Sequence, residues 1–192
     1  MLKHTEYENE TFSRQDLCSL KVHNKTYTDC KFENCKFIET DCSYSTFEDC
    51  LFEDCNLSLI VFNGAKLRNV IFENSKIVGV NFKKCDRFIF EIHFNKCFIQ
   101  RCNFSELEIR KGLFKESKIL ECDFVRTKLI EAYFRNSELS DTVFEDSNLS
   151  KANFEGAVKY DINPLNNKIT GAKFSIPNVV SLLNVFELKI EL

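Results

Sequence analysis

Large apolar residues return at every fifth position along most of this chain. In residues 142–157, TVFEDSNLSKANFEGA, Phe144, Leu149 and Phe154 follow one another at this interval, and each stands two positions after a small residue. An α-helix turns by about 100° per residue, so this spacing would scatter the apolar side chains around it. A strand alternates its faces, so an odd spacing would place them on opposite sides. The pattern instead predicts a short extended segment and then a corner, once per repeat, so that the chain winds around an apolar axis.

The five-residue pattern runs from Phe12 to Phe82 and, after a disturbance, from Phe94 to Phe154. A repeat at a fixed period is typical of a solenoid. The stretches that show the unit best are CKFEN, CKFIE, CLFED, AKLRN, CNFSE, CDFVR, AYFRN, SNLSK and ANFEG. They resemble A(D/N)LXX, the unit of the pentapeptide repeat proteins. Over roughly residues 10–157, the resemblance implies an all-β, right-handed quadrilateral β-helix of about twenty residues per coil, with the central residue and the small residue two before it pointing inward.

The disturbance between Phe82 and Phe94 shifts the repeat frame by two residues. We interpret it as a two-residue insertion near 85–90, with Ile89 as the inward residue between the two regular stretches. On a coil of about twenty residues, one face of the β-helix then carries a structural column of stacked rings: Phe12, Phe32, Phe52, Phe72, Phe94, Phe114, Phe134 and Phe154. A ten-residue alternation of Phe with Leu or Ile would also produce this column, so the column supports the frame more than the coil size.

The chain length fits one domain, and no Pro- or Gly-rich linker interrupts it. We expect the β-helix to occupy residues 1–174, with an irregular cap before about residue 10 and an irregular last coil over 155–174. Phe174 stands twenty residues after Phe154 and can continue the Phe column.

A different pattern follows in residues 175–192. Ser175 and Pro177 can begin a short α-helix, and FELKIEL alternates apolar and charged residues as a short strand does. The layout resembles the C-terminal module of Qnr-like pentapeptide repeat proteins, which implies an end-to-end homodimer. The predicted dimer interface is Val179, Val180, Leu182, Leu183, Phe186, Leu188 and Ile190. The alternative is that this module only caps its own coil, since a solenoid end exposes apolar side chains and strand edges.

Ten Cys residues raise the question of a metal site or disulfides. Eight of them, Cys30, Cys35, Cys50, Cys55, Cys85, Cys97, Cys102 and Cys122, occupy the small inward position, where Cys packs as a small apolar residue. Their spacing does not match a zinc site, and the three His residues do not cluster with them. We therefore expect no metal and no cofactor.

The sequence also lacks the motifs of common enzymes, including a phosphate-binding loop, HExxH and GxSxG. A β-helix filled by side chains has no interior pocket for a small molecule. We therefore expect no catalysis and no small-molecule ligand. No apolar run has the length of a signal peptide or a membrane span, so we expect a cytoplasmic protein that does not bind a membrane.

Charge is distributed unevenly along the chain. Residues 1–60 carry 12 acidic and 6 basic side chains, residues 61–130 carry 8 and 14, and residues 131–192 carry 9 and 6. The basic middle contains Lys83, Lys84, Arg87, Arg110, Lys111, Lys115 and Lys118. These cations either hold an anionic partner or are ordinary solvated residues. Few aromatic residues interleave with them, so we do not expect direct nucleic-acid binding.

The Qnr and MfpA-like branch of the pentapeptide repeat proteins resembles B-form DNA in shape. The resemblance implies a DNA mimic that binds type II topoisomerases, DNA gyrase or topoisomerase IV, and modulates quinolone susceptibility. Its physical basis is an acidic surface that enters a groove built for phosphates. Many Qnr proteins carry long loops, whereas this chain has only the short insertion near 85–90. The alternative function is a structural scaffold or protein-interaction module with another partner.

Overall fold

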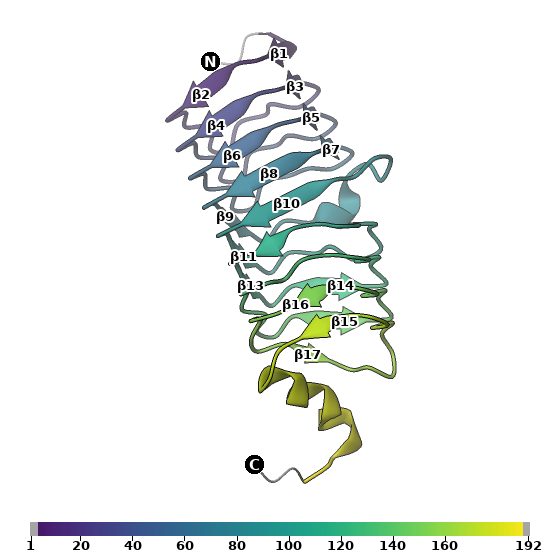
Figure 1. The fold of residues 1–192 in the computed structure, drawn as a ribbon. Helices are drawn as coiled ribbons and strands as arrows, with labels where there is room; N and C mark the ends of the chain where they lie inside the picture. The colour runs from purple at the N-terminus through teal and green to yellow at the C-terminus, as the bar shows by residue number, and fades with distance from the viewer. Residues whose placement is uncertain (1–3, 190–192) are drawn as a thin grey trace.

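Short parallel strands wind into a four-sided coil along the protein. A computed structural model describes residues 4–189. The chain forms a right-handed quadrilateral β-helix of about 8 turns, with one short helix at its C-terminal end (Figure 1). This confirms the predicted fold.

Two neighbouring faces of the β-helix begin at the N-terminus. One is a four-stranded sheet of β1 (Glu6–Glu8), β3 (Thr26–Thr28), β5 (Thr46–Glu48) and β7 (Lys66–Arg68). The other is a six-stranded sheet of β2 (Thr11–Ser13), β4 (Lys31–Glu33), β6 (Leu51–Glu53), β8 (Val70–Glu73), β10 (Ile92–Asn95) and β12 (Phe114–Lys115). We call the outer surface of this six-stranded sheet the front face; β2, β4, β6, β8 and β10 are stacked as arrows in Figure 1.

Shorter sheets form the remaining sides of the coil. A three-stranded sheet contains β9 (Lys76–Val78), β11 (Phe98–Gln100) and β13 (Lys118–Leu120). Another contains β14 (Asp123–Val125), β15 (Val143–Glu145) and β17 (Asp161–Ile162). The pair of β16 (Asn153–Phe154) and β18 (Lys173–Phe174) instead continues the side of the six-stranded sheet, to which bridges through Tyr133 connect it. A 3-10 helix, η1 (Phe82–Lys84), lies just before the insertion. Isolated parallel bridges continue the ladders where a strand is too short to be assigned.

The register between coils explains the Phe column. Phe12 pairs with Phe32, Phe32 with Phe52 and Phe52 with Phe72, each twenty residues on, whereas Phe72 pairs with Phe94 across the insertion. Consecutive rings of the column are stacked, with centroids 4.7–5.3 Å apart. Phe174 extends the column, 5.0 Å from Phe154. Ring spacing therefore follows the separation of paired strands, about 4.8 Å.

A second Phe column faces the first across the interior. It consists of Phe62, Phe82, Phe104, Phe124 and Phe144, also stacked ring on ring. Rings of the two columns meet edge to face; Phe94 and Phe104, for example, lie 5.9 Å apart with an interplanar angle of 80°. Offset stacking along a column and edge contact across the interior are the two arrangements that aromatic pairs prefer.

The coil begins earlier than the sequence pattern indicated. Tyr7 lies in β1, is buried, and stacks on Tyr27 at 5.2 Å with an interplanar angle of 9°. Tyr7 therefore occupies a central position five residues before Phe12. Its hydroxyl accepts a hydrogen bond from the backbone N–H of His4.

The insertion does not place Ile89 inward as predicted. Ile89 has φ 55° and is 57% exposed, whereas the side chain of Phe90 is buried. The ladder resumes at Glu91, whose N–H donates to the carbonyl of Leu67. The two extra residues therefore form a small outward loop that exposes Phe88, and the chain returns to the core one residue later than equal spacing implied.

The small inward positions hold the coils together through hydrogen bonds. The Thr127 hydroxyl donates to the carbonyl of Phe104 at 3.1 Å, and the Thr127 N–H donates to Ser147 Oγ at 2.9 Å. Buried hydroxyls that reach the next coil in this way satisfy polar groups that burial would otherwise penalise. The thiols of the eight Cys residues predicted at these positions are all buried, and they have no disulfide bonds.

In the last coil, the offset between paired residues falls from twenty to eighteen and then returns to twenty. Phe144 pairs with Ile162, eighteen residues on, but Asn148 bridges to Lys168 at the usual twenty. The difference is taken up in residues 163–166, where the Asn163 side chain accepts the N–H of Leu165. An Asn-Pro turn can absorb two residues in this way.

A helix follows the last coil, as predicted, but it is not an α-helix. It is a nine-residue 3-10 helix, η2 (Asn178–Phe186), which packs against β17. Ser175 does not cap it, because its hydroxyl accepts the N–H of Gly156 on the preceding coil. The predicted strand is wrong over residues 187–189, which have no strand pairing; residues 190–192 lie outside the described residues.

Candidate binding surfaces

The C-terminal helix presents apolar side chains outward. Leu182 is buried against the last coil and Val179 packs on the core, while Val180 is half-buried. By contrast, Leu183, Phe186 and Leu188 are 38%, 48% and 59% exposed. The predicted interface residues therefore separate into a capping set and an exposed set, and Ile190 lies outside the described residues. The exposed set is what an apolar partner surface could cover.

An acidic patch lies beside this helix on the sheet of β14, β15 and β17. We call Asp141, Glu145, Asp146 and Asp161 the C-terminal acidic patch; all four are exposed. Val143 of β15 pairs with Asp161 of β17, which brings residues from two successive coils together. Lys159 lies at the same groove but forms an ion pair with Glu138 at 2.7 Å. The patch is therefore a concentration of negative charge at the C-terminal end of the coil.

The N-terminal coils carry a second set of carboxylates. Glu33, Glu53 and Glu73 occupy the same position on three successive strands of the front face. Like charges directly opposite one another destabilise a sheet. Lys31 relieves this repulsion by bridging Glu33 at 2.6 Å and Glu53 at 2.8 Å, and its hydrogen bond lowers the pKa of Glu33. The Asn95 amide donates to both oxygens of Glu73 at 2.7 Å.

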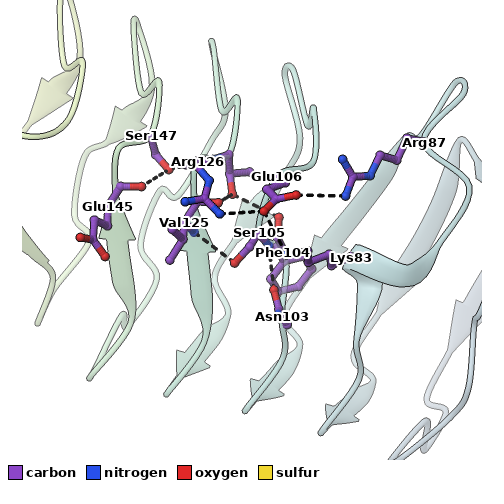
Figure 2. Close-up of polar contacts among 11 residues, drawn as sticks. Lys83, Arg87, Asn103, Phe104, Ser105, Glu106, Val125, Arg126, Glu145 and Ser147 are labelled. Carbon is purple, nitrogen blue, oxygen red and sulfur yellow. Dashed lines mark hydrogen bonds and ion pairs between the residues drawn. The ribbon is translucent and has the colours of Figure 1, made fainter.

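The basic middle is partly neutralised within the chain. The carboxylate of Glu106 forms ion pairs with Lys83 at 3.0 Å, Arg87 at 3.3 Å and Arg126 at 2.8 Å (Figure 2). These three cations come from the preceding coil, the insertion loop and the following coil. Of the other predicted cations, Arg110 pairs with Glu108 and Lys111 with Glu131. Lys84, Lys115 and Lys118 form no ion pair with any of residues 4–189. Ion pairs within the chain therefore neutralise four of the seven predicted cations and leave three.

Glu106 should titrate far below an ordinary glutamate. Hydrogen bonds from Arg126, Lys83 and Arg87 lower its pKa to about 2. Because the folded pKa is depressed, the stabilising effect is present above the unfolded value near 4.5 and is lost as the pH falls toward 2. We expect carbon-detected NMR to place the Glu106 titration about two pH units below that of exposed glutamates, and Arg126→Ala to move it upward. An ordinary midpoint in the intact protein would contradict the cluster.

No group of three or more His, Cys, Asp or Glu side chains within residues 4–189 is arranged to hold a metal ion. No helix among the described residues is long and apolar enough to cross a membrane.

Two buried hydroxyls, Tyr160 Oη and Ser181 Oγ, have no hydrogen-bond partner in the described part of the chain, and both residues line the groove between the last coil and η2.

Comparison with known proteins is consistent with this architecture. The family "Pentapeptide repeat region" matches residues 25–88, and the family "Pentapeptide repeats (8 copies)" matches residues 121–158. No curated protein sequence matches the chain.

Solved structures similar to this chain include QnrB1, described as a plasmid-mediated fluoroquinolone resistance protein. A trypsin-treated variant of QnrB1 is 15% identical, with a TM-score of 0.73 and coverage of 97% of each chain. The full-length form is 14% identical, with a TM-score of 0.65 and coverage of 95% of this chain and 100% of QnrB1. At such low identity, the likeness establishes a shared fold.

The sequence identified some parts of these surfaces and missed others. It identified the apolar residues after Ser175 and the basic middle. It did not show that the insertion loop brings Arg87 to Glu106, or that Asp141 and Asp161 lie at one groove. The pairing of Val143 with Asp161 is hidden in the sequence because it departs from the twenty-residue step.

Proposed function

This chain belongs to the pentapeptide repeat family, and from that premise we propose that it is a non-enzymatic, cytoplasmic binding protein whose target is a type II topoisomerase. The C-terminal acidic patch would occupy the basic surface on which DNA gyrase or topoisomerase IV binds DNA. In this role the protein imitates DNA and modulates quinolone susceptibility. The observation that carries the proposal is the concentration of exposed carboxylates beside an exposed apolar helix.

The proposed protein is a homodimer joined through its C-terminal module. Leu183, Phe186 and Leu188 expose an apolar surface at the end of the coil, while Leu182 keeps the helix attached to its own chain. Pairing two such ends would place both copies of the C-terminal acidic patch near the centre of a longer rod. A continuous acidic surface of this kind matches a groove that accepts a phosphate backbone.

The two components of the proposal can be tested in one assay. We expect the protein to inhibit DNA gyrase supercoiling, or to restore supercoiling in the presence of a fluoroquinolone. A Leu183→Asp/Phe186→Asp variant should be monomeric in light scattering and lose most of this effect. These exposed positions are preferable to Leu182, whose replacement would also damage the cap.

Charge is tested separately from dimerisation. An Asp141→Asn/Asp146→Asn variant should remain dimeric but lose about tenfold or more in apparent affinity for the topoisomerase, because carboxylates no longer face its cations. Glu39→Gln is the control: Glu39 is an exposed carboxylate at the same corner of the coil as Asp141, but it lies five coils toward the N-terminus, away from the C-terminal acidic patch. No effect of wild-type protein on gyrase or topoisomerase IV at high micromolar concentration would rule out this function.

One observation favours the alternative function, a scaffold or protein-interaction module with a different partner. The charges alternate along the rod, and the ion pairs around Glu106, Glu108 and Glu131 already use much of the basic middle. A surface of alternating charge suits a partner whose own charges alternate in a complementary way. Dimerisation without any effect on the topoisomerases would support this alternative.

A further inference from the structure

The front face carries two outward columns of side chains, one apolar and one charged. The residues before five consecutive central Phe residues, from Phe52 to Phe134, form what we call the apolar column: Leu51, Ile71, His93, Leu113 and Tyr133. His93 is its polar member, and its ring accepts the N–H of Leu113. The residues after six consecutive central Phe residues, from Phe32 to Phe134, form the charged column: Glu33, Glu53, Glu73, Asn95, Lys115 and Arg135. Ser13 and Glu155 follow the Phe residues beyond its two ends. In both columns, neighbouring members stand on successive coils.

The apolar column is accessible from outside. Ile71 is 38% exposed and Tyr133 44% exposed, and Leu51 and Leu113 are half-buried. Outward positions on a solvated sheet are ordinarily polar. Four outward apolar side chains along successive strands, interrupted only by His93, are therefore unusual, and contact with another protein surface is the usual reason for such a run.

The charged column changes sign at its middle. Its N-terminal half consists of glutamates, Asn95 is neutral, and its C-terminal half consists of Lys115 and Arg135. Glu53 and Lys115 are three coil steps apart, about 14 Å at 4.8 Å per step, so they cannot pair within one chain. Neither Lys115 nor Arg135 forms an ion pair with any of residues 4–189.

We propose that the front face binds the front face of a second copy of this chain, with the two rods antiparallel. A two-fold axis parallel to the strands, between the coils of Ile71 and His93, reverses the order of the coils but keeps the strand direction. Each column then lies over its own copy in reverse order. Isologous contacts of this kind are the commonest way in which identical chains associate.

The reversed order makes the two faces complementary. In the charged column, Glu53 lies opposite the second copy's Lys115, and Glu33 lies opposite the second copy's Arg135. In the apolar column, Leu51 meets Leu113, and Ile71 meets His93. Lys31 lies opposite Tyr133, where a cation can rest on the ring. Each contact occurs twice, because the axis relates the two copies.

The expected association is weak and sensitive to salt. A face of eight coils is about 34 Å long and about 10 Å wide, roughly 350 Å² per copy, below the about 800 Å² of a stable interface. The exposed ion pairs are screened at physiological salt. This surface is distinct from the C-terminal module, so a protein that used both contacts would form longer assemblies.

Exchanging the charges at Glu53 and Lys115 tests the antiparallel pair directly. Glu53→Lys places two lysines opposite each other twice in a homotypic pair, and Lys115→Glu places two glutamates opposite each other twice. Mixing the two variants restores opposite charges at both places. By sedimentation velocity at low salt, we expect the mixture to associate about tenfold or more tightly than either variant alone. The double variant Glu53→Lys/Lys115→Glu should self-associate as the wild type does.

The controls separate this contact from the C-terminal one. All variants are also made with Leu183→Asp/Phe186→Asp, so that failure or success of the end-to-end dimer does not affect the comparison. Glu39→Lys, at an exposed corner away from the front face, should not change association. Circular dichroism and melting temperature should match the wild type for every variant. A mixture that associates no more tightly than its components would overturn the proposal.

A second measurement needs no substitution on the front face. A carbodiimide joins a carboxylate to an amine only when the two are in contact. We expect a Glu53–Lys115 cross-link in the wild-type protein, formed between a ¹⁵N-labelled and an unlabelled chain and identified by mass spectrometry. Cross-links from Lys31 to Glu33 and Glu53 within one chain serve as the internal reference. Reference cross-links without a Glu53–Lys115 product between chains would contradict the antiparallel pair.

Discussion

Phe94→Ala should lower the free energy of unfolding by about 3–5 kcal/mol, the range for truncating a fully buried aromatic ring. Phe94 has no exposed surface, and its ring stacks on Phe72 at 4.9 Å and on Phe114 at 5.3 Å. The neighbouring strands are fixed in place by ladder hydrogen bonds on both sides, so the coil cannot collapse into the space that the ring leaves. Urea unfolding followed by circular dichroism measures the loss.

Two variants provide the comparison for Phe94→Ala. Phe94→Leu keeps most of the volume and should cost less than about 1.5 kcal/mol. Phe88→Ala removes a ring that is 73% exposed on the insertion loop and should change stability by less than about 0.5 kcal/mol. A loss below about 1 kcal/mol for Phe94→Ala would mean that the stacked column contributes little to the stability of the coil.

Gly64→Val should lower the free energy of unfolding by about 2 kcal/mol or more, because two costs add. Gly64 has φ +64°, a left-handed conformation that a β-branched residue adopts only with strain. Its new Cβ would also lie 2.7 Å from Cδ1 and Cε1 of the Tyr44 ring on the preceding coil. Thermal and urea unfolding of the purified variant would show the loss.

A double variant separates these two costs. Tyr44 is 70% exposed, so Tyr44→Ala removes the clash with little loss of buried area. In that background, Gly64→Val should still cost about 1–2 kcal/mol from the backbone alone, whereas Gly64→Asn should cost less, since Asn tolerates this conformation. Asn24 adopts φ 54° two coils away at the same corner. Equal costs for Val and Asn in the Tyr44→Ala background would exclude the backbone explanation.

Much of the fold could be predicted because the repeat is local. A central residue every fifth position, with a small residue two before it, sets the inward face of each segment without reference to the rest of the chain. The stacked column from Phe12 to Phe154 follows from that period once the insertion is assigned. The same reasoning could have identified Tyr7, which stands one step before Phe12.

Predictions failed where the period broke. Equal spacing predicted that Ile89 would point inward. Phe90 is the buried residue instead, because the extra residues form a loop outside the coil. The C-terminal helix was expected to be an α-helix followed by a strand. It is instead a nine-residue 3-10 helix, which ends at Glu187 in a left-handed conformation (φ 52°), and residues 187–189 form no strand.

The sequence by itself determined the coil, its inward residues and the apolar character of the C-terminal helix, because these depend on short-range spacing and on hydrophobicity. Only the tertiary structure decided which charges are neighbours. Residues about twenty positions apart lie one strand spacing away, so Lys83, Arg87 and Arg126 meet at Glu106, and the glutamates of the front face line up against Lys115 and Arg135 further along. The two-residue insertion decides that Lys83 and Arg87 reach Glu106, and the shift in the last coil decides that Asp161 lies beside Val143, whereas Arg126 meets Glu106 at the regular step of twenty.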